Sequence, residues 1–214
     1  MMTGTAVGAR RLGLLPYEQY WTALGLAAVG AMAGLAAAGE PLPPLGLLAV
    51  LGGLSALSVR FNVNDNDAPV GMAFSAQGVV IAAAVVAFRD TSPLLGPLLI
   101  GMCAAFWRIP RTRHQFVTVP ANFGINGLPA LGAAAVLAVL APADMASTLV
   151  LAAVVVPAAV VYAAVNGGLM AVYVRLLDGT KLEDCAVELR GQLASLYLPF
   201  AWGAFAGEVA LRFG

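Results

Sequence analysis

The side chains best suited to bind a ligand are four amides within long apolar stretches: Gln77, Asn122, Asn126 and Asn166. Asn122 and Asn126 are four residues apart, so a helix would carry both on one face. Polar side chains in apolar helices commonly hydrogen-bond to a neighbouring helix, so structural bonding and ligand binding are the two interpretations. Both predict that these amides, together with Ser75, point into the interior of a helical bundle.

Glu208 is the one acidic residue embedded in a predicted apolar helix. Ionisable groups at membrane depth are costly unless they face protein or water, which makes Glu208 a functional candidate. Arg212 follows four residues later, however, and an ion pair between neighbouring turns at a helix end is the simpler interpretation.

Motifs of known catalytic chemistry are absent from the sequence. It contains no GxSxG, no HExxH, no phosphate-binding glycine loop and no pair of intramembrane aspartates. His114 stands among arginines, and Cys103 and Cys185 form no CxxC pair. We therefore expect no enzymatic activity, no metal site and no cofactor.

The elements that must position these side chains are long uncharged stretches. Seven stretches lack Asp, Glu, Lys and Arg: residues 19–39, 41–59, 68–88, 91–107, 115–143, 145–174 and 191–207. A helix needs about 20 mostly apolar residues to cross a bilayer. The stretches do not alternate apolar and polar residues as membrane β-strands do. The sequence therefore predicts an all-α, polytopic transmembrane helical bundle with about seven spans, within a range of six to eight.

Composition supports one integral membrane domain over residues 1–214. Hydrophobic residues make up 61% of the 214 and charged residues 10%, whereas a soluble domain has about a quarter charged. We expect a multi-pass protein of the cytoplasmic (inner) membrane, with the lipid bilayer as its partner. The formal net charge is zero, so nothing in it favours nucleic acid.

Prolines and charged residues separate the predicted helices. We expect helices at about 17–39, a second one ending near 59, 71–88, 94–107, 121–140, 146–176 and 193–212. The sixth exceeds the bilayer thickness and contains Pro157 and Asn166-Gly167-Gly168, which predicts a kink or a strong tilt. Gly30 and Gly34 belong to small residues at four-residue spacing in the first helix, a pattern that permits close helix approach.

Basic residues indicate the orientation. With seven spans, nine of the 11 basic residues fall on one side, and only Arg89 and Arg212 fall on the other. Basic residues are enriched in cytoplasmic loops, so the N-terminus should be cytoplasmic. An odd number of spans then places Gly214 outside.

From Phe74 onward, the order of features resembles the membrane-embedded N-terminal sensor regions, called MASE-like, of bacterial diguanylate-cyclase and HD-type phosphodiesterase signalling proteins. Phe74-Ser75 opens a helix, and a proline-containing turn, an apolar helix and a basic loop follow. Then come a helix that opens with Asn122 and a long helix bearing Asn166, followed by a charged segment. Ala121-Asn122 stands where that family often has Phe-Asn.

The resemblance implies a non-catalytic module that senses a small-molecule ligand or a membrane condition. It also implies a cytoplasmic output domain, which these 214 residues do not contain, or a homodimer partner. The long sixth helix and the segment Arg175–Arg190 would then relay a shift. Two alternatives fit the same composition: the substrate-binding membrane subunit of a small-molecule, vitamin-type transporter, and a structural subunit of a larger membrane complex.

Overall fold

The computed structural model describes residues 16–58, 76–107, 113–140, 148–179, 199–209 and 211–212. Within these ranges every regular element is helical. In chain order they are α1 (Pro16–Ala37), α2 (Leu45–Ser58), α3 (Ala76–Ala87), α4 (Leu95–Cys103), the 3₁₀ helix η2 (Ala104–Trp107), α5 (Arg113–Leu140) and α6 (Thr148–Asp178). A further helical stretch covers 199–209, and we call residues 199–212 the C-terminal segment. The predicted all-helical class is confirmed.

Three of these helices are long and apolar enough to cross a membrane: Pro16–Ala37, Val119–Leu140 and Ala153–Leu176. The helices α2, α3 and α4 are shorter, with 14, 12 and 9 residues. Most of α3 and α4 is buried by other helices rather than exposed at the surface. Where protein encloses a short helix, non-helical backbone at its ends is tolerated at membrane depth.

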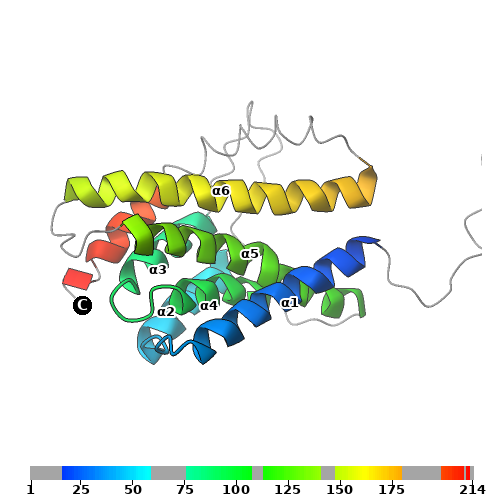
Figure 1. The fold of residues 1–214 in the computed structure, drawn as a ribbon, viewed down its shortest axis with the longest axis horizontal. Coiled ribbons are helices and arrows are strands. Elements are labelled where there is room, and N and C mark those ends of the chain that lie inside the picture. The colour runs from blue at the N-terminus through cyan, green and yellow to red at the C-terminus, as the bar shows by residue number, and fades with distance from the viewer. Residues whose placement is uncertain are drawn as a thin grey trace, which may run out of the picture.

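The long helices run side by side (Figure 1). The helices α5 and α6 form an antiparallel pair, and α1 lies along α5. The main core is formed by α3, α5, α6 and the C-terminal segment, together with one residue each of α2 and α4, and every residue of α3 from Ile81 to Ala87 is buried. α6 continues through Pro157 and Asn166-Gly167-Gly168 without a break.

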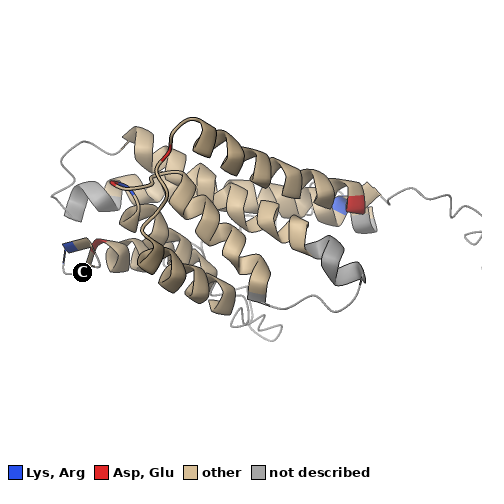
Figure 2. Ribbon diagram, turned by 90° about the horizontal axis from the view of Figure 1, so that it is seen from below, with Lys and Arg blue, Asp and Glu red and all other residues tan. Residues whose placement is uncertain are grey.

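The described charged residues gather at two ends of the molecule, with an uncharged body between them (Figure 2). One end holds the C-terminus of α1, the α3–α4 turn and the C-terminal segment, and we call it the Arg89 end. The start of α1 and the last turns of α6 meet at the opposite end, which we call the Trp21 end. Such a distribution is that of a helical membrane protein, with apolar surface at the centre and charges at the rims.

Helix boundaries agree with the sequence to within a few residues, with one correction. The fifth helix begins at Arg113 instead of residue 121, so Pro120 lies inside α5. Gly25 of α1 faces this proline, and a Cβ on Gly25 would lie 2.5 Å from the Pro120 Cβ. Membrane helices tolerate proline where a neighbouring helix covers the disturbed turn. Residues 71–75 and 193–198, expected to be helical, lie outside the described residues.

The glycines that bring helices together are not those of the four-residue pattern. A Cβ on Gly30 or Gly34 would meet nothing within 4 Å among the described atoms. Close approach instead occurs at Gly25, and at Gly124, where a Cβ would lie 2.5 Å from the Leu24 Cβ. The pattern failed because spacing alone does not tell which face of a helix meets its neighbour.

Candidate functional site

Two of the four predicted amides meet across helices. Gln77, in the first turn of α3, donates from Nε2 to Oδ1 of Asn126 on α5, at 2.9 Å. Asn126 in turn donates from Nδ2 to the backbone carbonyl of Asn122, also at 2.9 Å. Gln77 is only 6% exposed, so the prediction that it points inward is confirmed.

The other two amides do not join this pair. Asn122 contributes its carbonyl oxygen, and Asn166 lies half-buried on α6. Among the hydrogen bonds of the described residues, none connects Asn166 with Gln77 or Asn126. Ser75 lies outside the described residues. The candidate site is therefore the Gln77–Asn126 pair, which joins α3 to α5.

α4 packs directly behind the amide pair. A Cβ on Gly101 would lie 2.5 Å from the Asn126 carbonyl oxygen and 2.8 Å from the Cα of Gly127. A Cβ on Gly127 would lie 3.0 Å from side-chain atoms of both Leu98 and Met102. The turn of α5 that carries Asn126 is thus held close to the α4 backbone by glycines.

Both side chains of the pair are uncharged, and each can donate as well as accept hydrogen bonds. Each amide has one carbonyl oxygen and two N–H donors, and their mutual bond uses one donor of Gln77 and one lone pair of Asn126. One N–H group of Asn126 donates to the Asn122 carbonyl within α5. The remaining groups suit a neutral molecule that both donates and accepts hydrogen bonds. Neither residue can act as a nucleophile or as an acid or base.

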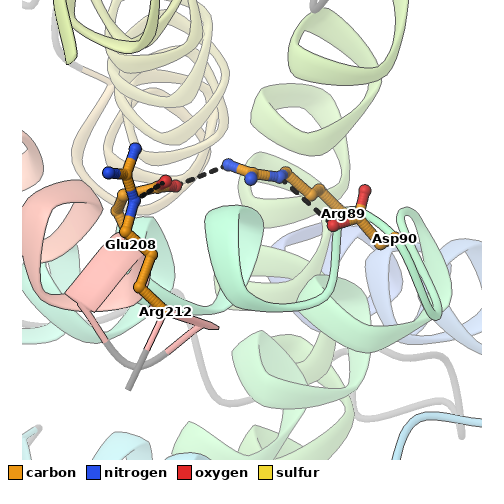
Figure 3. A network of polar contacts seen from close by, with 4 residues as sticks. All are labelled: Arg89, Asp90, Glu208 and Arg212. Atoms are coloured by element: carbon orange, nitrogen blue, oxygen red, sulfur yellow. Dashed lines mark hydrogen bonds and ion pairs between the residues drawn. The ribbon is translucent and has the colours of Figure 1, made fainter. Parts of the chain in front are cut away.

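A second polar cluster lies at the Arg89 end (Figure 3). Glu208 of the C-terminal segment accepts from Arg212 Nε at 2.8 Å, as the four-residue spacing predicts. Its other oxygen accepts from Arg89 Nη1, in the turn after α3, at 2.6 Å. Arg89 Nε also lies 3.4 Å from a carboxylate oxygen of Asp90.

The partnership of Arg89 with Glu208 was missed at the sequence level. One signal was available, because Arg89 and Arg212 are the two basic residues assigned to the same, outer side. The Glu208 side chain is 11% exposed and therefore needs compensation for its charge. Two arginines provide it, which favours the structural interpretation of Glu208.

Glu40 makes a second long-range contact at this end. Its Oε1 accepts from the backbone N–H groups of Leu94 and Leu95, at 2.8 and 3.3 Å. These are orphan donors at the start of α4, where a carboxylate is favoured by the helix dipole. Glu40 thereby ties the end of α1 to the start of α4.

Aromatic residues join α1 to α6 at the Trp21 end. Trp21 stacks on Tyr173 with ring centroids 5.2 Å apart. The Tyr20 hydroxyl donates to the backbone carbonyl of Leu169 at 2.9 Å. Aromatic residues with a polar edge are enriched where a membrane protein meets the headgroups.

Comparisons with known proteins give no relative. No family model matches the chain, and neither a curated protein nor a solved structure matches it. Among the described residues, no group of three His, Cys, Asp or Glu side chains could hold a metal ion.

Proposed function

We propose that this chain is a non-catalytic integral membrane module of the cytoplasmic membrane. In this proposal it detects a small neutral ligand and passes on a shift between helices. It crosses the membrane seven times, with the N-terminus in the cytoplasm and the Arg89 end outside. The positions of Glu40 and Arg89 support the alternation of the spans, because Glu40 follows the first predicted span, Arg89 follows the third, and both lie at one end.

The observation that carries the sensor function is the hydrogen bond between Gln77 and Asn126. It joins two helices inside an apolar bundle, where neither helix has a charged side chain near the pair. Hydrogen bonds between membrane helices stabilise a bundle by only about 0.6 kcal/mol on average. A ligand with its own donor and acceptor can therefore replace this bond at little cost and separate the two amides.

Replacement of the Gln77–Asn126 bond by bonds to a ligand would alter the position of α3 relative to α5. A ligand moves a conformational equilibrium only through contacts that differ between the two states. The amide pair provides such a difference, because the two side chains bind one another in one state and the ligand in the other. We expect the charged segment Arg175–Arg190 to follow the shift on the cytoplasmic side.

The experiment uses the natural Cys185 in that segment as a reporter. A Cys103→Ser variant in liposomes leaves Cys185 as the only thiol, which is then labelled with an environment-sensitive dye. The probes are a panel of neutral nucleobases, sugars and amides. We expect at least one to change the emission, Gln77→Leu and Asn126→Leu to abolish that change, and Asn166→Leu to keep it.

Two results would overturn the sensor function. One is emission that no probe changes in the protein with an intact amide pair. The other is accumulation of a probe inside the liposomes without any change in emission, which would favour the transporter alternative.

A further inference from the structure

The C-terminal segment is packed more closely on α3 than side chains would allow. A Cβ on Gly203 would overlap the Val79 backbone carbonyl, and one on Gly207 would lie 2.6 Å from the Ala83 carbonyl oxygen. Gly203 and Gly207 are one turn apart, as Val79 and Ala83 are. Two successive turns of the segment therefore rest directly on the backbone of α3.

The ion pair fixes the same two elements at the Arg89 end. Arg89 lies two residues after the end of α3, and its partner Glu208 comes one residue after Gly207. Backbone-to-backbone contact opposes rotation of either helix about its axis, and the ion pair opposes sliding of one helix along the other. The geometry makes α3 and the C-terminal segment one body.

The opposite end of α3 carries Gln77, which bonds to Asn126 of α5. α5 is packed on α6, where a Cβ on Gly132 would lie 3.2 Å from Val161 and 3.6 Å from Val165. The amide pair thus adds a directional polar link between two units, one made of α3 and the C-terminal segment and the other of α5 and α6, whose buried side chains also share one hydrophobic core.

We infer that the C-terminal segment is the relay of this module: it moves with α3 when the Gln77–Asn126 bond opens. The chain between α6, which ends at Asp178, and the start of the segment at Pro199 joins the two units directly. Relative movement of the units displaces one end of this connection against the other. The part of the charged segment Arg175–Arg190 that follows α6 lies within it.

One of the apolar contacts that cross between the units lies near the start of the segment. Phe200 packs against Tyr162 of α6 in a tilted arrangement, with ring centroids 5.6 Å apart. Both residues are buried and the contact is between rings, so it has no directional bond that fixes the register. It can accommodate a small displacement, which the contacts at Gly203 and Gly207 cannot.

Hydrogen exchange of the full chain in detergent micelles tests this coupling without a ligand. The inference rests on the proposed function for its biological meaning, but its test does not. We expect Gln77→Leu to raise exchange in peptides covering 199–212 by about threefold, through weakening of α3. The matched variant Asn166→Leu should leave hydrogen exchange of that segment unchanged. Gln77→Leu should likewise leave exchange in peptides of α1 unchanged.

Coupling is reciprocal, so a perturbation of the segment should reach Gln77. Gly207→Ala should raise exchange at residues 76–87, whereas Gly168→Ala, at an open position on α6, should not. Two results would overturn the inference. One is faster hydrogen exchange of α5 in Gln77→Leu while exchange of residues 199–212 stays unchanged. The other is unchanged exchange of α3 in Gly207→Ala. That failure would leave the amide pair available as a ligand site, so the two proposals fail separately.

Discussion

Arg89 and Glu208 are 119 residues apart in the chain, and their side chains are joined by a hydrogen bond of 2.6 Å. The bond unites the turn after the largely buried α3 with the C-terminal segment. Because the Glu208 side chain is 11% exposed and that of Arg89 is 20% exposed, the pair is largely shielded from water. Removal of one partner leaves the other charge in that environment.

Arg89→Gln should therefore lower the free energy of unfolding by about 1–3 kcal/mol, because Glu208 loses one of its two arginines. Asp90→Asn is the matched control. The Asp90 side chain is 71% exposed, so its loss should cost less than about 0.5 kcal/mol. Thermal unfolding in one detergent measures both variants, and equal midpoints for the two would contradict a structural role for the buried pair.

The amide pair should behave as a coupled unit. We expect Gln77→Leu and Asn126→Leu each to destabilise the fold by about 0.5–2 kcal/mol, since each leaves one amide without its partner. The double variant should cost less than the sum, because it leaves neither amide unpaired. Unfolding of the four proteins gives the coupling energy, and strict additivity would mean that the two side chains do not interact.

Local relationships in this fold could be predicted from the sequence. Arg212 bonds to Glu208 because residues four apart share one helix face, and that needs only the spacing. The meeting of Gln77 with Asn126 was one of several combinations that an inward-facing set of amides allowed. Asn166 is also an amide within an apolar stretch, yet it does not join them. The face that α6 turns toward its neighbours depends on the packing of the whole helix, and one polar residue does not determine it.

Contacts between distant segments could not be predicted in the same way. Glu40 bonds to α4 through backbone N–H groups, which every helix start offers, so no residue type at 94 or 95 signals the contact. Gly25 lies against Pro120, yet the chain has 24 glycines and 13 prolines that could have paired. Only the packed structure selects among them.

Two glycines of α1 should respond in opposite ways to the same substitution. Gly25→Ala places a methyl group 2.5 Å from Pro120, so α1 and α5 must separate, and we expect a loss of about 1–3 kcal/mol. Gly30→Ala adds a methyl group in open space and should be neutral or stabilising by up to about 1 kcal/mol. Comparable destabilisation by both would contradict the packing of α1 on α5.

Glu40→Ala should destabilise the start of α4 by about 0.5–2 kcal/mol, because Leu94 and Leu95 lose the acceptor for their N–H groups. Glu40→Gln keeps an oxygen acceptor and should retain part of the contact. Hydrogen exchange of peptides that contain residues 94 and 95 reads the effect locally. Unchanged exchange in Glu40→Ala would show that this carboxylate does not cap the helix.

The proposed seven-span orientation decides which side of the membrane the Arg89 end faces. Fusions to a reporter that is active only outside the cytoplasm test it most directly, at four positions. We predict activity for fusions at Gly214 and Asp144, and none at Arg111 and Arg190. An inactive fusion at Gly214 together with an active one at Arg190 would contradict both the span count and the proposed cytoplasmic relay.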